Sequence, residues 1–138
     1  MFSDSDVMRL GKEAKKEFLE KHKVKCKLIL ESLDNFWKLA NKSKIVQYEH
    51  RLGLPLKIGS LTVHGEIPLI VMNTEIINNM SNDSNFVKAL MMHELYHIYL
   101  NNKVLGVDEA FDSEEKDDEI FSKEFPKYYK LLRRQKTF

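Results

Sequence analysis

The sequence has few of the residues that define several classes of small protein. Its single cysteine, Cys26, excludes a disulfide framework and any zinc site made only of cysteines of one chain. Three prolines and five glycines exclude a collagen-like or low-complexity chain. The longest apolar runs, such as residues 69–72, are too short to cross a bilayer, and residues 1–6 lack the basic and apolar regions of a signal peptide. We therefore expect one cytoplasmic domain over residues 1–138 with no membrane partner.

The chain also lacks an excess of charge of either sign. Twenty-two basic and twenty-one acidic residues give a net charge of +1, which argues against direct nucleic-acid binding. The charges are nevertheless segregated along the chain. Residues 9–27 hold eight basic and three acidic side chains, residues 108–119 hold eight acidic and one basic, and residues 123–136 hold six basic and one acidic. The basic tail, residues 127–138, complements the acidic segment and is therefore a candidate autoinhibitory segment.

Apolar periodicity predicts a small α+β domain. The expected elements are an N-terminal helical region over residues 1–42, helices at 44–52, 85–100 and 109–125, strands at 54–58, 61–63 and 69–72, a polar loop at 78–85, and a possible helix in the tail. This order predicts N-terminal helices and a short mixed or antiparallel sheet that packs on helices.

The motif with specific chemistry is His93-Glu94-Leu95-Tyr96-His97, which lies within a predicted helix. Residues four apart share a helix face, so His93 and His97 can both reach one Zn²⁺ at about 2.0–2.1 Å. Glu94 lies about 100° around the helix from His93 and is placed to act as general base on a water that zinc activates. The pattern predicts a catalytic zinc site.

Such a site needs a third protein ligand. No histidine follows His97, so the third ligand is either a carboxylate or an earlier histidine: His22, His50 or His64. The helix at 109–125 places Glu115 on a core-facing stripe, with Glu114 at its edge. Acidic residues early in a helix also complement its dipole without any metal. Glu115 is the preferred ligand, and Glu114 is the competing one.

The order of the motifs resembles the gluzincins, and more narrowly the ImmA/IrrE-like family of zinc metallopeptidases. The matching segments are residues 52–56, 70–73, 93–97 and 115–125. The compact size is also similar to that of the minigluzincins. The resemblance implies a zincin-like fold, with His93, His97 and Glu115 as zinc ligands and Glu94 as catalytic base. Tyr96 stands where the family usually has glycine. A shift of the register by one residue gives Glu114 and Asp118, another gluzincin-like spacing.

The main functional hypothesis is zinc-dependent hydrolysis of a protein or peptide, and the resemblance implies a helix-turn-helix repressor as a possible substrate. An edge strand of the sheet could pair with an extended substrate. The donors available to stabilise an oxyanion are tyrosines: Tyr96, Tyr99, Tyr128 and Tyr129. The alternative hypothesis is a non-catalytic protein that binds zinc, or that binds a partner through its basic N-terminal helices.

Overall fold

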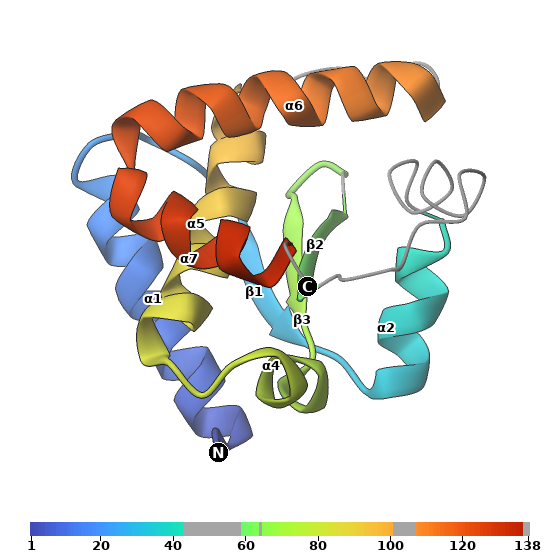
Figure 1. Ribbon diagram of the computed structural model, residues 1–138. Coiled ribbons are helices and arrows are strands. Elements are labelled where there is room, and N and C mark those ends of the chain that lie inside the picture. The colour runs from blue at the N-terminus through green and yellow to red at the C-terminus, as the bar shows by residue number, and fades with distance from the viewer. Residues whose placement is uncertain (43–58, 64, 101–106, 137–138) are drawn as a thin grey trace.

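The computed structural model describes residues 1–42, 59–63, 65–100 and 107–136, with only the backbone described at residues 107–115 and 134–136. Helices lie on both faces of a small sheet in this part of the chain (Figure 1). The elements in chain order are α1 (Asp4–Leu19), β1 (Lys27–Leu30), α2 (Leu33–Ala40), β2 (Ser60–Val63), β3 (Leu69–Met72), α4 (Thr74–Met80), α5 (Ser84–Leu100), α6 (Val107–Glu124) and α7 (Pro126–Lys136). The predicted α+β class is confirmed.

The described strands form a mixed sheet with β3 in the middle. β1 pairs with β3 in parallel, with Lys27 opposite Leu69, whereas β2 pairs with β3 in the antiparallel sense, with Val63 opposite Leu69. The sequence of β3 is entirely apolar, as expected for a strand that is covered on both faces. The predicted strands at 61–63 and 69–72 are therefore confirmed.

Strand β1 shows that one sequence prediction was wrong. Residues 27–30 were expected to continue the N-terminal helical region, but they form a strand between α1 and α2. Leu28 packs against the cluster under α1 and α5, whereas Ile29 packs against the cluster under α2. A short run that is apolar on both sides fits a covered strand as well as a helix, so periodicity alone did not separate the two.

Helix α1 lies very close to β1. A Cβ atom added at Gly11 would stand 2.3 Å from Leu28 Cδ2, so glycine permits this approach. The helix starts at a capping box, in which the Ser3 hydroxyl accepts from the amide of Asp6 and the Asp6 carboxylate accepts from the amide of Ser3. The cap fixes the start of α1, and its apolar residues, among them Leu10, Ala14 and Phe18, form the face that it buries.

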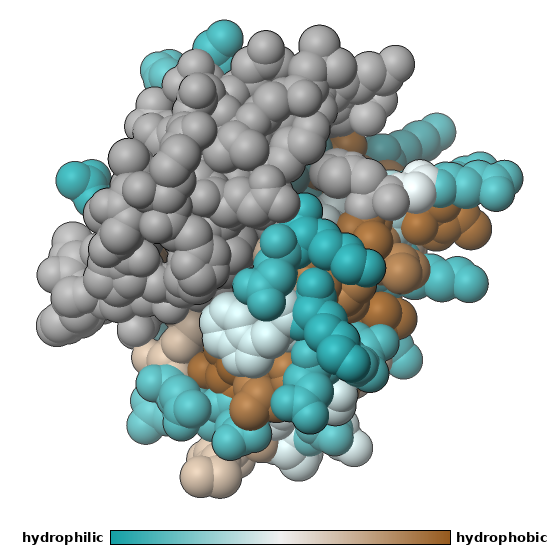
Figure 2. All heavy atoms as spheres, turned by 90° about the vertical axis from the view of Figure 1, so that its right-hand side faces the viewer, coloured by the Kyte–Doolittle hydropathy of each residue, from teal (hydrophilic) through white to brown (hydrophobic). Residues whose placement is uncertain are grey.

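Two apolar clusters cover the two faces of the sheet. The larger joins α1, α5, α6 and α7 to one face through residues such as Phe18, Leu95 and Phe121, and the smaller joins α2 to the other face through Phe36 and Val71. In Figure 2 the side of the molecule that carries α2 faces the viewer, and its described surface mixes apolar and polar side chains. The sheet is thus the middle layer of three.

The C-terminal tail is part of the larger cluster. The helix predicted there is α7, which buries Tyr128 and Leu132 against the rest of the protein. Truncation after Pro126 would therefore remove core residues. Such a truncation would test the stability of the fold as well as any autoinhibition by residues 127–138.

Helix α4 is the second departure from the predicted elements. Residues 78–80 were expected to start a polar loop, but they complete α4, whose start is capped by the Asn73 side chain accepting from the amide of Ile76 at 2.9 Å. Asparagine after a strand can start a turn, but it is also a strong N-cap residue. Here Asn73 caps a helix. The helices expected at 85–100 and 109–125 are confirmed as α5 and α6, each starting one or two residues earlier.

Several other predictions fall on residues outside the described part of the chain. They are the helix at 44–52, the strand at 54–58, and the positions of His50 and His64. Within the described residues, no helix combines the length and the apolar character needed to cross a membrane.

Candidate metal centre

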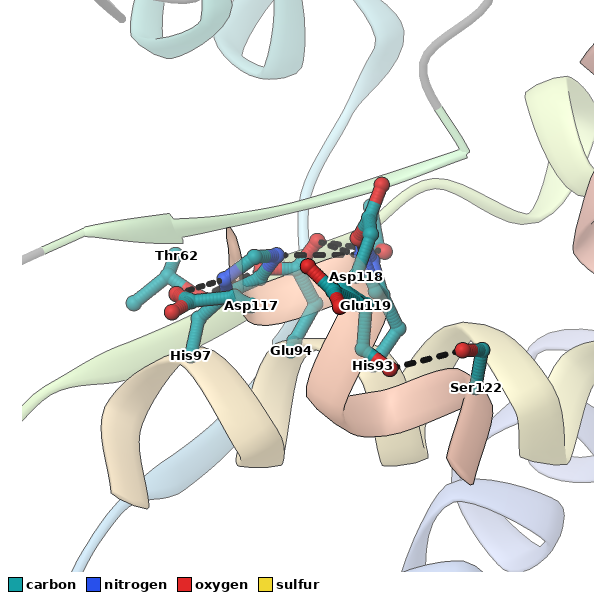
Figure 3. Close-up of polar contacts among 9 residues, drawn as sticks. Thr62, His93, Glu94, His97, Asp117, Asp118, Glu119 and Ser122 are labelled. Carbon is teal, nitrogen blue, oxygen red and sulfur yellow. Dashed lines mark hydrogen bonds and ion pairs between the residues drawn. The ribbon is translucent and has the colours of Figure 1, made fainter. Parts of the chain in front are cut away.

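The two motif histidines lie together on α5, the helix at the centre of the fold. Most of α5 is buried because helices or strands cover nearly every side of it. His93 and His97 are one turn apart, and the side chain of each is only 13% exposed. Their Nε2 atoms face each other at 3.0 Å (Figure 3). The helical spacing thus brings two potential ligand atoms to one point, as the sequence predicts.

Asp118 on α6 supplies a third potential ligand atom. Its Oδ1 lies 2.5 Å from His93 Nε2, and one donor atom each from His93, His97 and Asp118 lie within 4.8 Å of one another. Two atoms that bind one zinc tetrahedrally at 2.0–2.1 Å lie about 3.4 Å apart, so the imidazoles need to separate by only a few tenths of an ångström. Two imidazoles and one carboxylate are also a donor set suited to catalytic zinc.

The preferred third ligand of the sequence analysis, Glu115, lies in α6 one turn before Asp118. The side chains of Glu115 and Glu114 are outside the described part of the chain, so Glu115 as ligand stays a prediction. Asp118 shares the helix face of Glu115, because residues three apart are neighbours on a helix. The sequence analysis considered Asp118 only together with Glu114, whereas the structure places it directly beside His93.

Asp117 is a site residue that the sequence analysis missed. Its Oδ2 lies 2.7 Å from His97 Nδ1, and the residue is only 3% exposed. A proton on Nδ1 that is donated to Asp117 leaves the Nε2 lone pair free to bind a metal and fixes the orientation of the ring. Consecutive residues diverge by about 100° on a helix, so Asp117 and Asp118 each reach a different histidine. The feature of the sequence that could have pointed to Asp117 is the pair of adjacent acidic residues, Asp117 and Asp118, in the helix after the motif.

Glu94 faces strand β2. Its carboxylate accepts hydrogen bonds from Ser60 Oγ at 3.1 Å and from Thr62 Oγ1 at 2.5 Å, and the residue is only 8% exposed. Glu94 Oε1 is 4.0 Å from His93 Nδ1, so the carboxylate lies beside the cluster without belonging to it. The sequence analysis did not identify Ser60 and Thr62, because their role depends on where β2 crosses α5.

Tyr96, one of the tyrosines considered as oxyanion donors, has another contact. Its hydroxyl donates to Glu124 on α6, and the residue is buried. Burial, which is the larger cause, and the hydrogen bond to Glu124 together raise the pKa of Tyr96 above its usual range. The hydroxyl is therefore engaged in a helix–helix contact.

The other three tyrosines also make contacts away from the histidine cluster. Tyr128 donates to Glu17 on α1 at 2.9 Å, Tyr99 packs on His22 with ring centroids 4.1 Å apart, and Tyr129 packs edge-on against Phe121. Burial and the bond to Glu17 raise the pKa of Tyr128 to about 12. These contacts favour structural roles for the tyrosines.

His22, one of the earlier histidines considered as a ligand, lies beside Tyr96 and Tyr99. Its Nε2 donates to Glu124, and its ring packs edge-on against Tyr96. Within the described residues, the cluster that could hold a metal comprises His93, His97 and Asp118. The structure thus places His22 outside this cluster.

Family models, curated protein sequences and solved structures were compared with this chain, and none matched.

Proposed function

We propose that this protein is a zinc-dependent metallopeptidase of gluzincin type that hydrolyses peptide bonds. The observation that carries the proposal is the convergence of His93, His97 and Asp118 beside the carboxylate of Glu94. The donor set fits zinc because neutral imidazole and carboxylate are among its usual ligands. The zincin-like fold is part of this proposal, supported by an active-site helix that packs beneath a mixed sheet with β2 directly over Glu94.

In this proposal each residue has a separate task. The three cluster residues would hold the ion, with Glu115 as a competing or additional carboxylate. Zinc held by these residues would supply Lewis-acid chemistry, which polarises a peptide carbonyl and lowers the pKa of a water molecule. Glu94 would take a proton from that water and deliver it to the leaving amine. Asp117 would keep His97 in the tautomer that can bind the ion.

The proposed substrate is a protein or peptide, with a helix-turn-helix repressor as the candidate that the family resemblance suggests. β2 ends one side of the described sheet, in the order β1-β3-β2, and its side chains contact Glu94. An extended peptide near this strand would have its backbone close to the proposed base. This arrangement favours a peptide over a small-molecule substrate.

One observation favours a second candidate function, a protein that binds zinc without catalysis. Both carboxylate oxygens of Glu94 already accept hydrogen bonds, from Ser60 and Thr62. These bonds hold the Glu94 carboxylate against β2, as a side chain with a structural role would be held. The zinc would then stabilise the contact between α5 and α6.

One experiment separates the two functions. Purified protein is assayed for bound zinc by elemental analysis and for cleavage of a co-expressed candidate repressor and an unstructured peptide pool. We expect about one zinc per chain, loss of zinc in His93→Ala, and loss of cleavage with zinc retained in Glu94→Gln. Equal processing by wild type and Glu94→Gln would refute the peptidase, and wild type without bound zinc would refute both functions.

A further inference from the structure

A partly buried polar contact joins three separate parts of the chain near the end of α6. Glu124 accepts a hydrogen bond from the Tyr96 hydroxyl on one carboxylate oxygen and from His22 Nε2 on the other. The side chains of His22 and Glu124 are 15% and 26% exposed. Burial opposes ionisation of Glu124, but the bonds from Tyr96 and His22 outweigh it, and the pKa of Glu124 is lowered.

This contact lies next to the candidate metal centre on both helices without being part of it. Tyr96 directly precedes His97 on α5, and Glu124 follows Asp118 on α6 by six residues, about 9 Å along the helix axis. Phe121 lies between the two regions, with ring centroids 5.6 Å from His93 and 5.7 Å from Tyr96. α6 is thus attached to α5 at a polar cluster, at an aromatic contact, and at Glu124.

The two polar attachments differ in what they require. At the cluster, His93 and Asp118 are themselves candidate ligands, so their direct contact would change when an ion binds between them. At the other end, Glu124 is matched by two side-chain donors and needs no ion. The Glu124 end can therefore hold α6 in the same rotation about its axis whether or not a metal is bound.

We propose that His22, Glu124 and Tyr96 are positioning residues that set the register of α6 on α5, so that Asp117 and Asp118 meet His97 and His93. This inference deepens the proposed function and rests on metal binding by the cluster. A rotation of α6 by one residue, about 100°, would carry Asp118 away from His93. Tyrosine at position 96 supplies the donor that a glycine or alanine there would lack.

The test compares Tyr96→Phe and Glu124→Gln with Tyr128→Phe as a matched control. Tyr128 is also a buried tyrosine that donates to a glutamate, but its bond joins α7 to α1. Zn²⁺ affinity is measured by competition with a chromophoric chelator, and the visible absorption of the Co²⁺-loaded protein reports the geometry of the ligands. Circular dichroism confirms that each variant is folded, and His22→Gln, which keeps a donor group, supplies the conservative replacement.

We expect Tyr96→Phe and Glu124→Gln to weaken zinc binding about tenfold and to shift the Co²⁺ bands, as the loss of outer contacts does at other metal sites. Tyr128→Phe should leave both readouts unchanged, and His22→Gln should retain most of the affinity. Equal affinities and spectra for Tyr96→Phe, Glu124→Gln and Tyr128→Phe would overturn the inference while leaving metal binding intact. Wild type that binds no Zn²⁺ or Co²⁺ would instead overturn the proposed function.

Discussion

Replacement of Asp117 by asparagine tests how the candidate metal centre is organised. Asparagine keeps the size of the side chain but removes the negative charge that faces His97 Nδ1 at 2.7 Å. Asp117 is only 3% exposed, so little water is available to replace the lost interaction. Loss of an outer partner of a metal-binding histidine lowers metal affinity about 10- to 100-fold. This corresponds to about 1.4–2.7 kcal/mol of binding free energy.

The measurement is the dissociation constant of Zn²⁺, obtained by competition with a chelator at fixed pH and ionic strength. Glu119→Gln is the matched control, because it removes one negative charge two residues away on the same helix from a side chain that is 70% exposed. We expect the control to change affinity less than threefold, since exposed charges are screened by solvent. If Asp117→Asn and Glu119→Gln weaken binding equally, Asp117 acts only through its charge, and its assigned role in orienting His97 is refuted.

Three further predictions concern the third ligand, the proposed base and a buried tyrosine. Asp118→Ala should weaken Zn²⁺ binding more than 100-fold, and Glu115→Gln should weaken it less; the reverse order in the same chelator competition would make Glu115 the third ligand. Thr62→Val keeps the shape of the side chain but removes a donor at 2.5 Å from Glu94, so any peptidase activity should change several-fold in kcat while zinc content stays constant. Unchanged kcat would show that Thr62 does not position Glu94. The pKa of Tyr128 is raised to about 12, so its neutral form contributes stability that is complete below the ordinary pKa of about 10 and is lost as pH rises towards 12. Stability of wild type should therefore fall more steeply than that of Tyr128→Phe between about pH 10 and 12, by roughly 2 kcal/mol in chemical denaturation, and parallel pH profiles would contradict this assignment.

Local sequence patterns predicted the helical elements of the site well. α5 and α6 follow from regular apolar spacing, and the helix bounds differ from the expected ones by only one or two residues. β1 was not predicted, because residues 28–30 are apolar on both sides of a strand and fit a helix equally well. What decides between the two is the partner strand β3, which lies some forty residues later in the chain.

The sequence by itself determined that His93 and His97 lie on one helix face with Glu94 beside them, because helix geometry fixes the direction of residues that are four apart. Only the tertiary structure decided which residues meet this face. Asp117 and Asp118 reach the histidines because α6 packs on α5 in one particular rotation, and Thr62 reaches Glu94 because β2 pairs with β3 in one register. A rotation of α6 by one residue, or a shift of the β2 register by one residue, would turn these side chains away. Neither the rotation nor the register follows from local periodicity.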